Sequence, residues 1–466
     1  QSNDPASTDA TGVRLDDGAV MANTDVLLGR RSPLGDGVAI AGAGVSVLDS
    51  RIDASQGIVT ATAGISGVVQ RIRVDFDTTG ALVHAGGLTI EDSLFVNRVE
   101  IAGVRRGLSV NAQSADAALA ADHVTLVGTA DAGAVGLVLQ AGSSHHGELA
   151  FRNGIVTAYP DSLLRVATGG AVADLTTDYS DYSGGTAQNS GAGSLMETNH
   201  VVADPGFTSG ADFHLRPDSP LVDAGDPAPL TNEESPSDLA GAPRVLDGSG
   251  DCVARRDIGA FEFTPGPRAP LAVATAAPAQ PVTNQPVSFD ASESCDPDGD
   301  PLTYSWTFDG GQARGGASAT QGFSKAGLHF ATVTVTDSTG RSATDTVAVR
   351  VSAPPMPAFA GVAIPKQTLK VSRKGVAAVK LRCPVETVGA CTGRLTLSRA
   401  GDKNAGAASY AIARGATRKV SVKLSKRTRA ALAKARRLNV TAAASAHDAN
   451  GTTRRSKATV KLVAPR

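Results

Sequence analysis

The sequence predicts an all-β protein in which a stack of short parallel strands is followed by two antiparallel β-sandwiches. Short apolar runs recur in residues 1–203, each beside Asp or Asn. The 51 Gly and 24 Pro interrupt the chain too often for long helices. Apolar and polar residues alternate from residue 271 onward, as in half-buried strands. A chain of 466 residues can hold several such domains, each with its own core.

The first segment, residues 1–203, carries a loose repeat. Apolar runs flank an Asp or Asn at positions such as Asp92, Asp122, Asn153 and Asp178. The steps between these four residues are 30, 31 and 25, the length of one solenoid coil with variable loops. Asx residues tolerate a left-handed backbone bend between two strands, and inward Val, Ile, Leu and Ala would then stack from coil to coil.

Residues 204–264 are expected to close this stack at its open end. Pro and Gly allow only short strands and turns here, and charged residues lie between small apolar groups. Burying a charge without a partner is costly. We therefore expect Arg244 to form a structural ion pair with Asp223 or Asp257. A catalytic cluster of carboxylates is the alternative interpretation.

Motifs in this closing segment resemble a known family. DPGF, SPLVDAGD, DLAGAPR and DIGAFEF occur in the order found at the C-terminal end of secreted bacterial right-handed parallel β-helix proteins of the "choice-of-anchor Q" type. The resemblance covers residues 204–263. It implies that residues 1–203 form a parallel β-helix, and it implies no activity by itself.

Several enzyme families use the parallel β-helix, so a site has to be sought separately. Pectin hydrolases of this scaffold need paired Asp residues and a Gly-His-Gly loop, whereas the chain offers only Asp16-Asp17 and no such loop. The pair His145-His146 is interpreted as a solvated loop. Lysine is absent before residue 325, so a lyase would need an arginine as its base. The candidates are Arg71, Arg73, Arg105 and Arg106, and we predict no catalytic residue.

After the proline-rich linker 265–270, residues 271–352 are predicted to form a β-sandwich. The runs FDASESCDPDGDPLTYSWTFDGG and GLHFATVTVTDSTG resemble a polycystic-kidney-disease (PKD) repeat, although WTFDGG replaces the usual WDFGDG. Trp306 shares a strand face with apolar residues, which favours a core position over sugar stacking. Asp296, Asp298 and Asp300 have the alternate spacing of a calcium loop, and the competing interpretation is a solvated acidic turn.

The last segment, residues 358–466, follows a second proline-rich linker, and its apolar and polar residues also alternate as in half-buried strands. It resembles the basic Ig-like modules that end many actinobacterial surface proteins. A short helix is expected over residues 425–437, with Ser425 as the N-cap and Leu432 and Ala435 facing inward.

Charge separates the two parts of the chain. Residues 356–466 hold 24 Lys+Arg against 3 Asp+Glu, a net charge of +21, and the remaining 355 residues hold 20 against 42, a net charge of −22. This asymmetry indicates an anionic partner for the basic module, such as a cell-wall polymer or polysaccharide. Nucleic acid is a less favoured partner because aromatic residues for base stacking are scarce.

The four cysteines indicate an extracellular or cell-surface protein. Cys383 and Cys391 bracket a short turn and are expected to form a disulfide, and Cys252 and Cys295 remain as a second candidate pair. The first thirty residues show no signal peptide, and no stretch is long enough for a membrane span. No His/Cys spacing indicates zinc, and no cofactor is expected apart from the calcium considered above.

These observations favour a secreted, modular and non-catalytic protein for adhesion or for carbohydrate or cell-wall binding. Two alternatives remain. The first is a polysaccharide lyase or glycoside hydrolase with its site on the flank of the β-helix, and the second is a structural stalk.

Overall fold

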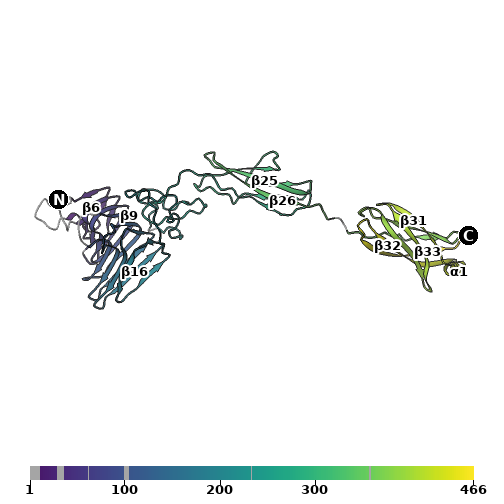
Figure 1. Cartoon of the computed structure of the whole chain (residues 1–466), viewed down its shortest axis with the longest axis horizontal. Coiled ribbons are helices and arrows are strands. Elements are labelled where there is room, and N and C mark those ends of the chain that lie inside the picture. The colour runs from purple at the N-terminus through teal and green to yellow at the C-terminus, as the bar shows by residue number, and fades with distance from the viewer. Residues whose placement is uncertain are drawn as a thin grey trace. The chain divides into compact units, whose positions relative to one another are not determined.

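The computed structural model describes residues 11–28, 36–60, 62–98, 104–231, 234–355 and 358–465. They form two compact units, one mainly of the chain up to residue 350 and the other mainly of the chain from residue 351 onward. Strands dominate both, and α1 (Lys426–Ala435) is the one α-helix in these ranges (Figure 1). The predicted all-β fold is confirmed. None of the described helices is long and apolar enough to cross a membrane.

The first part of the chain is a parallel β-solenoid of nineteen strands. They are β1 (Thr11–Leu15), β2 (Val20–Ala22), β3 (Asp25–Leu27), β4 (Asp36–Ile40), β5 (Val45–Leu48), β6 (Arg51–Thr60), β7 (Ser66–Gln70), β8 (Arg73–Val83), β9 (Gly86–Asn97), β10 (Arg106–Ala112), β11 (Ala117–Val127), β12 (Val135–Ala141), β13 (His146–Arg152), β14 (Ile155–Thr157), β15 (Asp161–Ala167), β16 (Val172–Asp178), β17 (Asp181–Tyr182), β18 (Gly185–Ser190) and β19 (Leu195–Thr198).

These strands stack on three faces, because each strand pairs in parallel with one from the next coil. The first face contains β1, β4, β10, β12, β15 and β18, and the second contains β2, β5, β7, β13, β16 and β19. The third contains β3, β14 and β17. Strands β6, β8, β9 and β11 are long enough to contribute to two faces.

A ladder of left-handed residues turns the chain from the second face to the third. Positive φ angles of 44–52° occur at one position in each successive coil, at Asn23, Asp49, Arg71, Asp92, His123, Asn153, Tyr179 and Asn199. The proposed role of Asx at the bend therefore holds at Asp92 and Asn153. It was one residue off at Asp122 and Asp178, where His123 and Tyr179 adopt the bend.

A serine after the bend residue satisfies the backbone polar groups of the corner. The Ser93 hydroxyl donates to the Glu91 carbonyl at 2.6 Å and accepts from the Ile72 N–H of the preceding coil at 3.3 Å. Ser50 and Ser180 make equivalent contacts in their coils. Such partners are needed because buried backbone groups without hydrogen bonds are destabilising.

The interior consists of stacked apolar residues. Val47, Val69, Ile90, Ala121 and Phe151 occupy equivalent positions in five consecutive coils, and each is at most 3% exposed. Each coil alone would leave its apolar side in water, so stability depends on stacking.

The closing segment contacts several coils along the left-handed corner. Its Arg244 reaches Asp92, its Ala260 N–H donates to Thr125, and its Asp226 N–H donates to Asn153. The last strands of the stack, β18 and β19, pair with β15 and β16. Closure of the open end by this segment stays a prediction. Docking at the corner is favourable because the polar groups of several coils converge there.

Residues 271–352 contain seven strands in two antiparallel sheets. One sheet has the order β20 (Thr275–Ala277), β21 (Pro286–Asp290) and β24 (Ser318–Gly322), and the other has the order β23 (Arg314–Gly315), β22 (Thr303–Phe308), β25 (Gly327–Thr336) and β26 (Ser342–Val351). Trp306 is fully buried against Phe289, which confirms its predicted core position.

The basic module has a five-stranded and a two-stranded sheet. The first has the order β27 (Thr368–Lys370), β33 (Thr453–Val463), β32 (Arg437–His447), β29 (Cys391–Arg399) and β30 (Asp402–Ile412), and the second pairs β28 (Val376–Arg382) with β31 (Thr417–Lys423). Helix α1 begins after Ser425, whose side chain accepts from the Thr428 N–H as predicted. Thr428 and Leu432 face inward, whereas Ala435 is exposed, contrary to the prediction.

Candidate functional site

A row of polar and charged side chains runs along the outer surface of the second solenoid face. Strand register places Gln70, Glu91, Asp122, Arg152 and Asp178 at the same position in consecutive coils. Each residue immediately precedes the left-handed corner, so its side chain lies on the outer surface. Neighbours in such a row lie about 4.8 Å apart, which brings side chains distant in sequence into contact.

This row borders a pocket of about 330 Å³, which we call the flank groove. Its floor contains the small residues Ala120 and Ala150 on neighbouring strands. Thr231 and Glu234 of the closing segment contribute to its lining. The charged lining residues are Glu91, Asp122, Arg152, Asp178 and Glu234.

Arg152 is the basic residue of the groove, and three carboxylates hold it. Its guanidinium donates to Asp122 at 2.6 Å, to Asp226 at 3.3 Å and to Glu234. Asp122 also accepts from the Asn153 amide at 2.8 Å. Because these contacts come from the preceding coil and from the closing segment, Arg152 is fixed in position while its side chain remains 36% exposed.

Glu91 is the residue of the groove whose proton affinity is most altered. Burial, the neighbouring Asp92 and the charges of Asp122 and Glu234 raise its pKa to about 7, against a hydrogen bond from Gln70 at 2.9 Å. At neutral pH the carboxyl group is therefore partly protonated. It can donate as well as accept a hydrogen bond, and it can act as a general acid.

The groove has a net negative charge, which determines what it can bind. Four carboxyl groups line it with one guanidinium, and that guanidinium is already paired. A uronate would meet repulsion here, whereas neutral hydroxyl groups or an ammonium group would find acceptors. This electrostatic argument disfavours the lyase alternative at this site.

The arginines considered as lyase bases are not brought together. Arg71 pairs with Asp49 at 2.7 Å, Arg73 with Asp75 at 3.1 Å, and Arg105 with Asp131. Burial lowers the pKa of Arg106.

The other sequence candidates also lie outside the groove. His146 is exposed but begins strand β13 rather than lying in a loop, and it contacts Asp174 at 2.9 Å. Asp17 accepts from the Ala43 N–H in a turn.

Arg244 forms a buried ion pair, but not with the predicted partners. It is fully buried and donates to Asp92 of the solenoid and to Glu262 at 2.7 Å. Asp223 instead accepts from the Gly248 and Ser249 N–H groups, and Asp257 accepts from the Asp223 and Phe263 N–H groups. The sequence could not reveal the long-range partner, Asp92, because it lies 152 residues away.

The buried carboxyl groups around Arg244 resist ionisation. Burial raises the pKa of Asp257 to about 7 and that of Asp92 to about 6, the latter against the attraction of Arg244. The pKa of Glu262 is also raised, first by burial and then by Asp257. These shifts accompany a structural contact between the closing segment and the solenoid, and the groups lack the exposure that a catalytic cluster needs.

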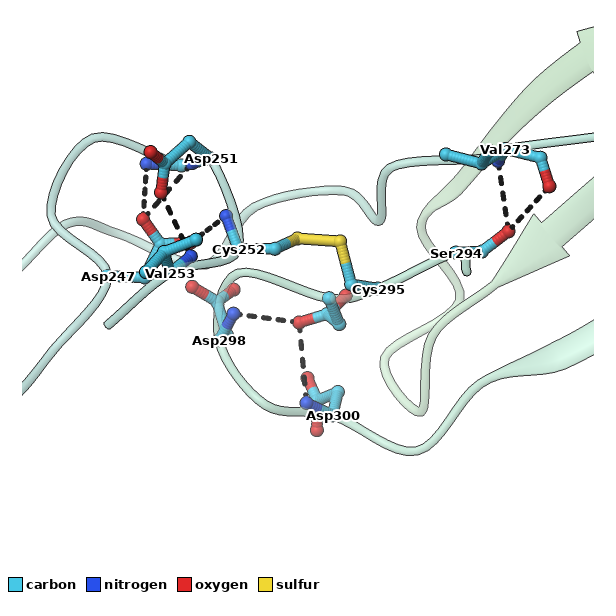
Figure 2. Close-up of a disulfide and its surroundings, with 11 residues drawn as sticks. Asp247, Asp251, Cys252, Val253, Val273, Ser294, Cys295, Asp298 and Asp300 are labelled. Carbon is cyan, nitrogen blue, oxygen red and sulfur yellow. Dashed lines mark hydrogen bonds between the residues drawn. A yellow bond between two sulfur atoms is a disulfide. The ribbon is translucent and has the colours of Figure 1, made fainter. Parts of the chain in front are cut away.

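The four cysteines form two disulfides in the pairs that the sequence suggested. Cys383 and Cys391 are eight residues apart, both fully buried, and connect β28 to β29. Cys252 and Cys295, 43 residues apart, connect the closing segment to the following sandwich (Figure 2).

Aspartates lie on both sides of the second disulfide (Figure 2). One ligand oxygen from each of Asp296, Asp298 and Asp300 lies within 4.8 Å of the others, so the predicted calcium loop is geometrically possible. Asp296 already accepts from the Asp298 and Asp300 N–H groups at 2.9 and 3.3 Å. Calcium binding therefore remains a prediction.

Sequence reasoning missed Glu91 and Arg152 as site residues. Both belong to the motifs that marked the coils, IEDS and FRNG, where they immediately precede the Asx residue. Aligning the coils on those motifs would have placed them in one row. Only Glu234 carried no such signal, because it comes from the closing segment.

Comparison with known proteins identifies one domain. Residues 267–351 match the family model of the PKD domain. None of the curated proteins compared with this chain matches it.

Solved structures include two similar PKD domains and one more distant protein. The PKD1 domain of Vibrio anguillarum Epp is 28% identical over 19% of this chain and 100% of its own, with a TM-score of 0.17. The PKD1 domain of the Vibrio cholerae metalloprotease PrtV is 31% identical over 18% of this chain and 99% of its own, with a TM-score of 0.16. A carbohydrate-binding module of the β-sandwich superfamily is 19% identical over 34% of this chain and 86% of its own, with a TM-score of 0.19. The chain is thus a modular β protein in which residues 267–351 are a PKD domain.

Proposed function

We propose that this chain is an extracellular modular protein that binds carbohydrate in the flank groove and attaches to an anionic polymer through its basic module. The PKD domain and the two disulfides indicate an extracellular setting. The observation that carries the proposal is the groove itself, a concave site with a floor of small residues and convergent polar groups.

The groove favours neutral or amino sugars over acidic ones. Glu91, Asp122, Asp178 and Glu234 supply acceptors, and the partly protonated Glu91 also supplies a donor. The paired Arg152 can donate to a sugar hydroxyl without leaving its carboxylates, because a guanidinium has five N–H donors. The groove lacks an aromatic platform apart from Phe151, which points into the core. We therefore expect modest affinity per site.

A binding screen tests the proposal. Isothermal titration of the full chain with neutral, amino and acidic oligosaccharides should give heat with the first two classes and none with uronates. Arg152→Met should abolish binding, whereas Arg14→Met, on an exposed pair with Asp16, should not change it. Absence of binding to every class would favour the alternative of a structural stalk.

Hydrolysis is a second candidate function, and one observation favours it. Glu91 is partly protonated near pH 7 and lies beside Asp122 in the register of the sheet, so an acid and a carboxylate can be adjacent. However, Asp122 is held by Arg152 and Asn153, which limits its use as a nucleophile or base. Release of reducing ends that is lost in Glu91→Gln would establish the enzyme, and unchanged oligosaccharides would exclude it for the substrates used.

A further inference from the structure

One end of the basic module contains a pocket of about 870 Å³. We call it the basic end pocket and define it by four lining cations, Lys370, Arg373, Arg436 and Arg437. They come from the end of β27, the turn after it and the junction between α1 and β32. The end of β33, Val463 to Pro465, provides the remaining side. All four cationic residues are exposed.

No acidic residue lines this pocket. The three acids of the module lie elsewhere. Asp402 accepts from Ser425 and Thr428 at the N-terminal end of α1, roughly 15 Å from its C-terminal end. Asp448 follows the far end of β32, roughly 35 Å from Arg437, and Glu386 lies in the loop between the cysteines. Among the described residues, no acidic side chain of the module therefore compensates the mutual repulsion of the four cations.

Arg436 adds a second unfavourable feature at the same place. It caps α1 with φ 61° and ψ −25°, a left-handed conformation in which glycine is strongly preferred. An arginine is therefore present at a position where glycine would fit the backbone better.

The helix dipole explains only part of this arrangement. The C-terminal end of a helix favours nearby cations, which accounts for one arginine at the end of α1. Lys370 and Arg373 belong to β27 and its turn, so the dipole gives no reason for their position. A ligand with repeated negative charges would compensate all four residues together.

We infer that the basic end pocket binds oxyanion groups, phosphate or carboxylate, that repeat along an extracellular polysaccharide or polyol polymer. Arginine forks bind both groups through two parallel hydrogen bonds, which a lysine cannot do. The inference rests on the proposed attachment of the basic module to an anionic polymer and assigns that attachment to four residues. The anionic groups then replace the missing acidic partners.

Binding of the full chain to immobilised polymers tests this inference. A poly(glycerol phosphate) and a polygalacturonate distinguish phosphate from carboxylate, with dextran as the neutral control, at about 150 mM salt where weak surface pairing is screened. The pocket variant combines Lys370→Gln, Arg373→Gln, Arg436→Gly and Arg437→Gln. We expect it to weaken binding to at least one polyanion by roughly tenfold or more. Arg436→Gly alone should weaken binding while raising the melting temperature, because glycine relieves the left-handed strain.

A matched variant separates the pocket from the general charge of the module. Lys380→Gln, Arg382→Gln, Lys419→Gln and Lys423→Gln remove four exposed cations from β28 and β31. This variant should bind almost as tightly as the wild type. Equal weakening by both variants would overturn the assignment of binding to the pocket and would favour attachment through the general charge of the module. Failure of the wild type to bind either polyanion would overturn both the pocket assignment and the proposed attachment. Tighter binding to single-stranded DNA than to either polymer would also overturn the assignment.

Discussion

The contact of Arg244 with Asp92 and Glu262 offers the sharpest test of how the closing segment is held. Arg244→Met removes a fully buried guanidinium and leaves the buried carboxyl groups of Asp92 and Glu262 without the cation that donates hydrogen bonds to both. Loss of one partner from a buried ion pair destabilises a protein by about 3–5 kcal/mol. For a domain of this size, 1 kcal/mol corresponds to a melting shift of about 2–4 °C, so we expect a decrease of about 6–20 °C.

Differential scanning calorimetry of the full chain measures this shift in the transition of the solenoid. Arg216→Met, in an exposed pair with Asp218, is the matched control and should change stability by less than about 0.5 kcal/mol. Adding Asp92→Asn and Glu262→Gln to Arg244→Met should recover part of the loss, because neutral groups need no buried counter-charge. A decrease in melting temperature smaller than about 2 °C, or no recovery of the melting temperature in the triple variant, would refute the role given to this ion pair.

Three further predictions follow from the same structure. The pKa values of Asp257 and Asp92 are raised to about 7 and 6, so their contribution to stability is complete below pH 4 and is lost as the pH rises through 6–7. Urea unfolding from pH 5 to 8 should show this loss of stability, and the loss should be smaller in Asp257→Asn. Millimolar calcium should raise the melting temperature of the PKD domain but not that of Asp298→Asn; an unchanged wild-type curve would show that the turn needs no ion. Replacing Cys383 and Cys391 with Ala should destabilise the basic module by about 2–3 kcal/mol in guanidinium unfolding, and a loss near zero would contradict this.

The fold was predictable to the extent that it depends on local patterns. Alternation in the two sandwiches and Asx at the bends follow from backbone geometry, so Trp306, Ser425 and Asn153 were placed correctly. The bend at His123 was missed because a histidine carries no bend signal of its own. His123 occupies the position equivalent to Asp92 and Asn153 in the adjoining coils and shares their left-handed conformation.

The candidate site was less predictable because its parts meet only through coil register and docking. Glu91, Asp122 and Arg152 are about thirty residues apart, and their contact depends on loop lengths that vary from coil to coil. The partners of Arg244 illustrate the same limit. Asp223 and Asp257 were plausible partners of Arg244 because they are close to it in sequence, but both accept hydrogen bonds from backbone N–H groups of the closing segment itself.

The closing segment connects the stability of the solenoid to the shape of its groove. Glu234 pairs with Arg152 of the solenoid and with Arg256 of the segment, at 3.2 Å for the latter. Arg244 holds the same segment against Asp92, the residue next to Glu91. Loosening the segment would therefore hydrate Glu91, lower its pKa and release Arg152 at the same time. Because burial is the main cause of the raised pKa of Glu91, Arg244→Met should alter the groove without touching it. A carboxyl titration of Glu91 by NMR that is identical in wild type and Arg244→Met would separate the two roles and show that the groove is formed by the coils alone.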